Sequence, residues 1–235
     1  MKFVEFFGMP GSGKTYLTAK LKKKKNYFSN EILIIYFKSK SIYSILNKIS
    51  SILIALPFIL KSRSLQKLIY FFRFFYKPIN SKYYSIRTLS IFFNTLYLIS
   101  IIKLSNFAKK KIILVDQGFY QIFSSIIYEM NILKYDEYND LIKKWILILS
   151  NLKVEHRIIG LNSQKQSVLN RIINRKGDSI MDNRNNHKYF YYYSEIFKFI
   201  ISILKKEIYL NYAAEIFTFD SKNLNLINLI NSIDQ

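Results

Sequence analysis

Five short apolar runs along the chain have the character of buried β-strands. They are KFVEFF (2–7), EILIIYF (31–37), KIILVD (111–116), VEHRIIG (154–160) and EIFTFD (215–220). The runs are rich in Ile, Val and Phe and lack strict alternation of apolar and polar residues, which is typical of strands buried on both faces. Helical stretches separate all five. The pattern therefore predicts an α/β fold with an open parallel sheet covered by helices.

The longest interval without a strand signal lies between the second and third runs. Residues 41–110 are dense in Leu, Ile, Phe and Tyr, with Lys and Arg between them. We predict a large all-helical insertion here, with a break near residues 77–80 where a proline and a polar turn interrupt the pattern. The apolar runs at 49–60 and 89–102 are shorter than the ~18–20 residues needed to span a bilayer, which indicates buried or interfacial helices.

Length and composition limit the class of protein. A chain of 235 residues, half of them hydrophobic, fits a single domain over residues 1–235. The chain has no cysteine and two histidines, which excludes disulfides and thiolate metal sites and makes a histidine-rich zinc site unexpected. Its first residues lack the features of a secretory signal. These observations favour a cytoplasmic protein.

The charge balance is strongly basic. There are 36 Lys and Arg against 15 Asp and Glu, a net charge of +21. Such a charge attracts polyanions, anionic membrane surfaces or phosphorylated small molecules, although dispersed lysines are equally compatible with a compositional habit. The one tight cluster, Lys22 to Lys25, ends a predicted helix, where cations offset the helix dipole. With no helix-turn-helix, zinc-finger or aromatic-sheet signal, the sequence predicts no specific nucleic-acid partner.

The first strand is followed at once by a phosphate-binding pattern. Residues 8–15 read GMPGSGKT and match G-x-x-x-x-G-K-[ST]. In such a loop the glycines let backbone N–H groups converge on phosphate oxygens, while Lys14 reaches the β and γ phosphates and the Thr15 hydroxyl binds Mg²⁺. A strand before the loop and an amphipathic helix after it favour this function over a flexible glycine turn. The predicted ATP-binding residues are Gly8, Pro10, Gly11, Ser12, Gly13, Lys14 and Thr15.

Two carboxylates are further candidates for the site. Asp116 ends the third apolar run, where a P-loop protein needs an acidic residue to hold the water shell of Mg²⁺; the alternative is a turn cap. Glu5 interrupts the first strand, on the same side as Phe7 by alternation. It is either a base or substrate contact, or a buried glutamate paired with a nearby cation.

A basic helix is predicted after the fourth strand. Arg171 and Arg175 are four residues apart and therefore lie on the same edge of this helix. Arginines on a movable segment close over a triphosphate and stabilise the charge that develops on the transferred group. The alternative for this pair is a solvated basic edge.

The order of these parts resembles a known group of proteins. After the fourth strand and its R-x-x-x-R come KYFYYYSEIFKFIISIL (188–204) and a last strand–helix pair. Together with the phosphate loop, the long insertion and the strand ending in Asp116, this order resembles the thymidylate kinase and nucleoside monophosphate kinase group of P-loop proteins. The stretches VEFFGMPGSGKT and VDQG are also similar to kinase-like P-loop proteins from bacterial surface-polysaccharide gene clusters.

The resemblance implies a strand order of 2-3-1-4-5 and roles for several residues. It makes Lys14 and Thr15 the ligands of the triphosphate and Mg²⁺, and Asp116 the carboxylate on the Mg²⁺ side.

The resemblance also implies a lid and an acceptor-binding region. It makes residues 163–190, with Arg171, Arg175 and Arg184, a lid, and it places the acceptor beside residues 41–110. The phosphate loop carries no arginine, so a further cation for the transition state comes from the lid or the insertion.

One position departs from the thymidylate kinase pattern. Thymidylate kinases carry Asp-Arg after the third strand, and that arginine grips the phosphate of the acceptor. This chain has Asp116-Gln117, and a glutamine supplies no charge. Either Arg63, Arg73 or Arg87 in the insertion replaces the contact, or the acceptor is not a monophosphate.

Two functions are compatible with the sequence. The first is an ATP- and Mg²⁺-dependent phosphotransferase that passes the γ-phosphoryl group to a small acceptor. The second is an NTP-binding or NTP-hydrolysing module that contacts a membrane or macromolecular partner through its basic, apolar insertion, as a cytoplasmic protein peripheral to the inner face of the membrane. An arginine pair after the fourth strand favours transfer, whereas an insertion with a contiguous exposed apolar face favours docking.

Overall fold

The structure is a computed structural model of the 235-residue chain. It describes residues 1–23, 32–35, 42–61, 63–75, 82–129, 135–163, 167–168, 170–171, 187–208 and 214–220.

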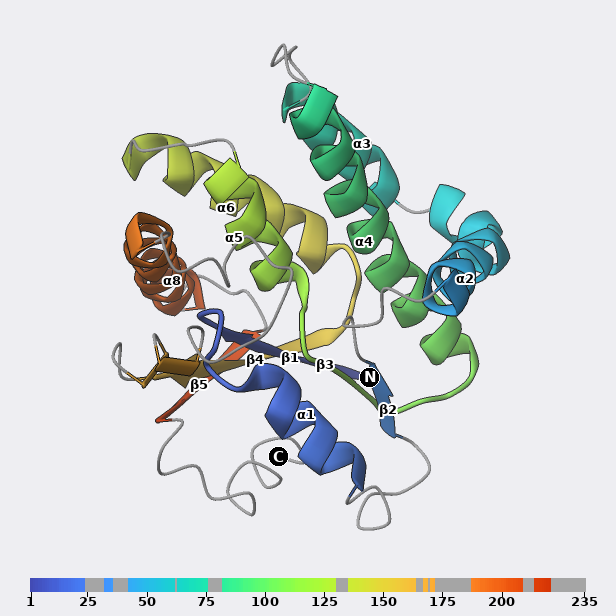
Figure 1. The fold of residues 1–235 in the computed structure, drawn as a ribbon. Helices are drawn as coiled ribbons and strands as arrows, with labels where there is room; N and C mark the ends of the chain where they lie inside the picture. The colour runs from blue at the N-terminus through green and yellow to red at the C-terminus, as the bar shows by residue number, and fades with distance from the viewer. Residues whose placement is uncertain are drawn as a thin grey trace.

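A parallel sheet forms the centre of the molecule (Figure 1). Its strands are β1 (Lys2–Gly8), β2 (Ile32–Ile35), β3 (Ile112–Val115), β4 (Glu155–Asn162) and β5 (Ala214–Asp220). The order across the sheet is β2-β3-β1-β4-β5, and all neighbouring strands run parallel. The prediction of an α/β fold with a parallel sheet covered by helices is confirmed.

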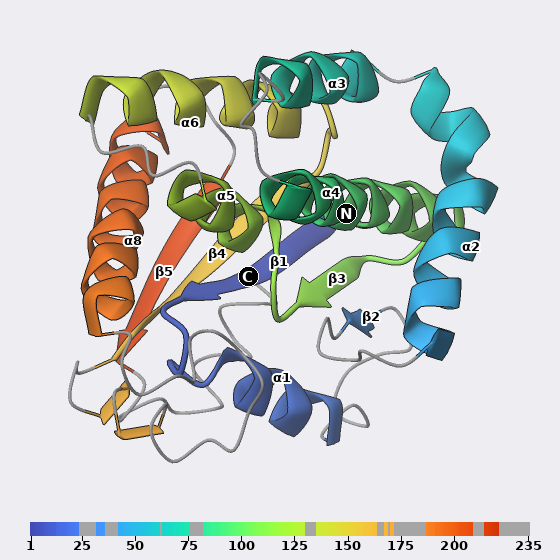
Figure 2. The same cartoon turned by 45° about the horizontal axis from the view of Figure 1, so that its top comes forward.

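Helices cover both faces of the sheet. They are α1 (Lys14–Lys23), α2 (Ile42–Leu60), α3 (Arg63–Phe75), α4 (Lys82–Phe107), α5 (Phe119–Glu129), α6 (Tyr135–Ser150) and α8 (His187–Ile208). Of these, α1 lies on one face and the others lie on the opposite face (Figures 1 and 2).

Alternation along β1 decides which side chains meet which layer. Val4 and Phe6 pack with Leu17 and Leu21 of α1, in a small apolar cluster. Phe3 and Phe7 point the other way, into the large core beneath α4, α5 and α8. Every one of these apolar side chains is buried, as expected for a strand covered on both faces.

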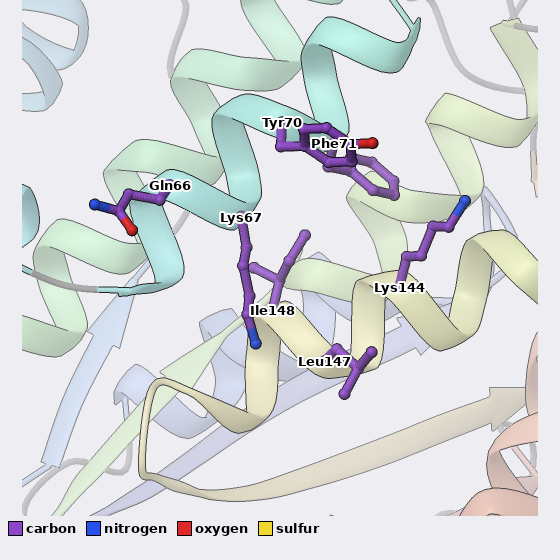
Figure 3. Close-up of a pocket in the computed structure, with 7 residues that line it drawn as sticks. All are labelled: Gln66, Lys67, Tyr70, Phe71, Lys144, Leu147 and Ile148. Atoms are coloured by element: carbon purple, nitrogen blue, oxygen red, sulfur yellow. The ribbon is translucent and has the colours of Figure 1, made fainter.

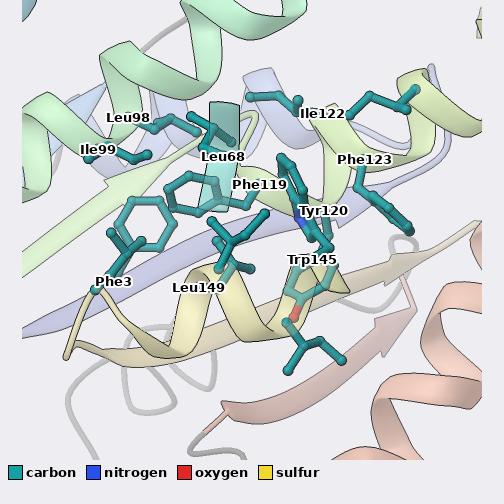
Figure 4. Close-up of a cluster of buried hydrophobic side chains, with 14 of the residues drawn as sticks. Phe3, Leu68, Leu98, Ile99, Phe119, Tyr120, Ile122, Phe123, Trp145 and Leu149 are labelled. Atoms are coloured by element: carbon teal, nitrogen blue, oxygen red, sulfur yellow. The ribbon is translucent and has the colours of Figure 1, made fainter. Parts of the chain in front are cut away.

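The large core joins the sheet to the helices that lie between β2 and β3 in the chain. Trp145 of α6 is fully buried, stacks on Phe123 with ring centroids 5.5 Å apart, and contacts Phe71 of α3 at 5.1 Å. Figure 4 shows Leu68 of α3 and Leu98 of α4 in the same cluster. Residues 42–107 therefore contribute three helices to the core that also contains the sheet.

The described parts of the insertion are helical except for the turns at Lys61 and at residues 108–110. The predicted break at 77–80 lies outside the described residues, between α3 and α4. In α4, the window Leu89–Phe107 is 19 residues long and is apolar and long enough to cross a membrane by length and composition. The sequence predicted that the apolar run at 89–102 is too short to span a bilayer. That prediction was wrong in length, because the apolar segment continues to Phe107. The inner face of α4 is nevertheless in the core, since Leu98 and Ile99 are fully buried.

Candidate nucleotide-binding site

The loop between β1 and α1 has the backbone that its sequence predicts. Gly11 and Gly13 have φ angles of +82° and +98°, a region that favours glycine. The Ser12 N–H donates to the Met9 carbonyl at 3.0 Å, which closes the turn. Gly8 fits closely, since a Cβ there would lie 2.8 Å from Ser12 Oγ and 3.0 Å from the Leu161 carbonyl of β4.

Lys14 lies inside this loop. Its side chain is buried, and its Nζ donates to the carbonyls of Gly8 at 2.5 Å and Met9 at 2.9 Å. Ser12 Oγ lies 3.5 Å from the same nitrogen. An ammonium group held by the loop's own backbone is placed where a loop-bound phosphate would meet a positive charge.

The structure brings Thr15 and Asp116 together. Thr15 Oγ1, in the first turn of α1, donates to Asp116 Oδ2 at 3.3 Å. Asp116 follows β3, is buried, and its own N–H donates to the Ile35 carbonyl of β2 at 3.4 Å. Because β1 and β3 are parallel neighbours, the turns after both strands meet at one edge of the sheet.

The Thr15 and Asp116 oxygens fit Mg²⁺. This ion takes oxygen ligands and is usually held by one or two carboxylates together with waters and phosphate oxygens. Among the described residues, no group of three or more His, Cys, Asp or Glu side chains could hold a metal ion. One hydroxyl and one carboxylate leave the other positions around Mg²⁺ to waters and phosphate oxygens.

Glu5 is fully buried beside this edge of the sheet. Its carboxylate accepts hydrogen bonds from the Tyr120 N–H at 3.2 and 3.3 Å, and His156 Nε2 of β4 lies 3.1 Å from Oε1. A carboxylate at the first turn of α5 is favourable because it meets the positive end of the helix dipole. Glu5 thereby connects β1, β4 and α5, and its role as base or substrate contact stays a prediction.

The sequence did not indicate the partner of Glu5. His156 is buried, stacks on Tyr120 with centroids 5.4 Å apart, and pairs across the sheet with Phe3. Only the pairing of β1 with β4 brings it within reach of Glu5, so no local motif could have found it.

The segment after β4 reaches back to the phosphate loop. Arg171 Nη1 donates to the Gly11 carbonyl at 3.2 Å, and the same nitrogen lies 3.8 Å from the position of a Cβ on Gly13. Val168 is fully buried and packs with Met9 of the loop and with Phe197 of α8. The predicted proximity of Arg171 to the phosphate loop is therefore present in the structure.

Comparison with solved structures gives matches along nearly the whole chain. Deoxyadenosine kinase from M. mycoides with bound dCTP matches over 99% of this chain and 100% of its own, with a TM-score of 0.50 and 17% sequence identity. Thymidylate kinase from Ehrlichia chaffeensis matches over 98% and 97%, with a TM-score of 0.52 and 15% identity. The chain shares the fold of these two kinases. At these identities the likeness is one of fold.

The other comparisons add no narrower family. No protein-family model matches the sequence. No curated protein matches it either. The resemblance to kinase-like proteins of polysaccharide gene clusters finds no support in the comparisons, which favour the P-loop nucleoside kinases.

Five arginines that the sequence predicts as site residues have no described side chain. Arg175 and Arg184 lie outside the described residues. Arg63, Arg73 and Arg87 belong to α3 and α4, and the structure describes their backbone and not their side chains. Gln117, the residue that replaces the arginine of thymidylate kinases, is exposed.

A pocket of about 390 Å³ lies elsewhere, between α3 and α6 (Figure 3). Tyr70 and Phe71 line it from α3, and Leu147 and Ile148 line it from α6, with a lysine on each helix. None of its lining residues belongs to the phosphate loop or to the turn at Asp116. We therefore do not assign this pocket to the nucleotide.

Proposed function

We propose that the protein is an ATP- and Mg²⁺-dependent phosphotransferase that moves the γ-phosphoryl group to a small acceptor. The observation that carries the proposal is the contact between Thr15 and Asp116, 101 residues apart in the chain and 3.3 Å apart in space. A phosphate-loop hydroxyl and a strand-end carboxylate are the two protein groups that hold Mg²⁺ in P-loop enzymes. The P-loop kinase fold of the chain supports the same chemistry.

The proposed roles follow from where the groups lie. Backbone N–H groups of residues 8–15 and the start of α1 bind the phosphates, and Lys14 offers its ammonium to the β and γ oxygens. Bound Mg²⁺ neutralises charge on the same oxygens. Arg171, already on the loop, and Arg175 serve as lid cations that strengthen their contacts as charge moves toward the leaving oxygen.

We infer that the acceptor is a nucleoside or a related small molecule. The matched structures are those of kinases named for deoxyadenosine and thymidylate. Gln117 brings no charge to the position after Asp116, which favours an acceptor without a phosphate at that point. In this proposal residues 41–110 form the acceptor side, residues 163–190 form the lid, and the enzyme works in the cytoplasm.

A second candidate function is an NTP-binding or NTP-hydrolysing module that acts with a partner. The observation that favours it is the row of exposed apolar side chains on α2, such as Leu53 and Ile54, which are 61% and 62% exposed. An exposed apolar face on a basic insertion is suited to docking. The two candidates share the nucleotide site and differ in what happens to the γ-phosphoryl group.

Removal of Lys14 tests the nucleotide site. In the parent protein, Mg·ATP at about 100 times its Kd should stabilise the fold by about 2.7 kcal/mol. In Lys14→Ala this stabilisation should be nearly absent, because the buried ammonium of the loop is gone. Thermal unfolding with and without Mg·ATP measures it.

The matched control is Lys20→Ala, which removes an exposed lysine from the same helix. It should keep the full stabilisation by Mg·ATP. Equal stabilisation of the parent and Lys14→Ala would rule out the phosphate-loop assignment.

A further inference from the structure

Helix α2 has one buried face, and exposed apolar side chains lie on two other sides of it: Ile54 and Phe58 on one side, and a longer row on the other. Ala55 and Ile59 point into the core, and Lys48 on this side donates to Asn94 Oδ1 of α4 at 3.0 Å. The longer row consists of large apolar side chains between 38% and 61% exposed, which we call the α2 stripe: Ile45, Leu46, Ile49, Leu53, Leu56 and Leu60.

The α2 stripe is continuous along the helix. With 3.6 residues per turn, its six members fall within a sector of roughly 100° beside the buried face. An apolar sector of this width normally faces a core or a membrane interface. On α2 it faces away from the protein.

The position of α2 leaves the stripe accessible. The helix lies at the outer edge of the molecule, next to α4, in both views (Figures 1 and 2). Phe107, at the end of α4, is 79% exposed and contacts Phe58 of α2, outside the stripe, with ring centroids 6.2 Å apart. The loop between β1 and α1 lies on the other side of the molecule, so a partner on the stripe leaves the nucleotide site open.

The insertion that carries the stripe has charged residues of one sign. Residues 41–110 contain eleven cations and no Asp or Glu. The cations are Lys48, Lys61, Arg63, Lys67, Arg73, Lys77, Lys82, Arg87, Lys103, Lys109 and Lys110. A surface that binds this insertion must therefore offer both an apolar layer and negative charge.

This charge decides between the occupants. A symmetric dimer would bring the same patch of two copies together. It would set one insertion without any acidic residue against another, and like charges across an interface are unfavourable. An anionic bilayer offers an apolar interior to the stripe and negative headgroups to the surrounding lysines.

We propose that α2 docks the protein on an anionic phospholipid surface, with the α2 stripe at the level of the headgroups and acyl chains. The basic residues of the insertion hold the protein at that surface by attraction to anionic lipid. This inference is independent of the phosphotransfer proposed above, because it uses none of the nucleotide-site residues.

Co-sedimentation with vesicles tests the proposal. The full-length protein should bind vesicles of phosphatidylcholine containing phosphatidylglycerol, and bind vesicles of phosphatidylcholine alone much more weakly. Leu53→Glu should weaken binding to the anionic vesicles by about tenfold or more, since it removes a stripe leucine and adds a repelled charge. Circular dichroism and thermal unfolding of the variant should match those of the parent, because Leu53 is exposed.

The matched control is Leu147→Glu on α6, which changes a leucine of similar exposure, 56%, by the same charge. It should bind anionic vesicles nearly as well as the parent. Equal loss in both variants would show attraction by net charge alone and overturn the assignment of the α2 stripe. Absence of vesicle binding, or a dimer in sedimentation equilibrium that Leu53→Glu dissociates, would overturn the membrane as occupant.

Discussion

The side chain of Lys14 is held by hydrogen bonds to the backbone of the phosphate loop. A buried ammonium group is costly unless its donors are satisfied, and here the carbonyls of Gly8 and Met9 accept from it. These carbonyls are directed inward by the turn that Gly11 and Gly13 allow through their positive φ angles. In the proposed site the backbone that positions Lys14 would also bind phosphate, so a change in the loop conformation would also move the charge of Lys14.

Asp116 is the residue whose removal should separate metal binding from nucleotide binding. In Asp116→Asn, the affinity for ATP without Mg²⁺ should stay close to that of the parent, because in the proposed site the carboxylate would contact the metal rather than the phosphates. The gain in affinity on adding Mg²⁺ should disappear. Calorimetric titration with ATP, with and without Mg²⁺, measures both values. A variant with the parent's Mg²⁺ dependence would make Asp116 a structural turn residue.

Gly118 lies directly against the Glu5 side chain, so there is no room for a side chain at position 118. A Cβ on this glycine would lie 1.6 Å from Glu5 Oε2, and the Glu5 side chain has no room to move because it is fully buried. Gly118→Ala should therefore lower the free energy of unfolding by about 1–3 kcal/mol or more. Chemical denaturation measures the change.

The double variant with Glu5→Gly identifies the cause of this loss. Glu5→Ala would keep the Glu5 Cβ, 2.4 Å from the position of the new methyl group, whereas Glu5→Gly removes the Cβ as well as the carboxylate. Gly118→Ala should therefore cost less in the Glu5→Gly background than in the parent. Equal costs in the two backgrounds would show that the loss at Gly118 has another origin.

At the scale of elements, the strands could be predicted from sequence and their partners could not. Runs such as KIILVD predict a strand buried on both faces. The structure agrees, because Ile113 and Leu114 pack on opposite sides of the sheet. The contact between Glu5 and His156 depends on which strands are neighbours, which no single run contains. The strand order came from the resemblance to known kinases rather than from the pattern.

The helices of the insertion show the same limit. Their composition predicted helices, but the sequence did not tell which apolar residues of α2 enter the core and which remain exposed. Ala55 is buried whereas Leu53 is exposed, and both are apolar. Packing against α4 selects one face, and that choice depends on the tertiary structure.

Helix α3 should unfold together with the sheet. Leu68 is fully buried in the large core, so Leu68→Ala should lower the free energy of unfolding by about 2–5 kcal/mol in a single transition. The neighbouring Ile69 is 49% exposed, and Ile69→Ala should change stability by less than about 0.5 kcal/mol. Denaturation followed by tryptophan fluorescence suits this test because Trp145 belongs to the same core. A main transition that Leu68→Ala leaves unchanged would mean that the insertion unfolds separately.

At the scale of the whole molecule, one chain combines the proposed nucleotide site with a basic, apolar insertion. The phosphate loop, the turn at Asp116 and Arg171 meet at one edge of the sheet, although they lie far apart in the chain. The sequence predicted the loop, Asp116 and the arginine pair as site residues. The structure brings Arg171 to the loop, and Arg175 lies outside the described residues. The acceptor could not be predicted, because no motif in the sequence specifies it.

The central claim is that the γ-phosphoryl group of ATP passes to an acceptor other than water. The measurement is the fate of γ-labelled phosphate after incubation of the parent protein with ATP, Mg²⁺ and a panel of nucleosides, nucleotides, sugars and polyol phosphates. We expect label in one class of acceptor, dependent on Mg²⁺ and absent in Lys14→Ala. In Arg171→Ala, transfer should fall on the order of 10³-fold, while the affinity for ATP stays within about tenfold, or ~1.4 kcal/mol. Label found only in inorganic phosphate with every acceptor would contradict phosphotransfer, and equal transfer by the parent and Arg171→Ala would contradict the role of the lid.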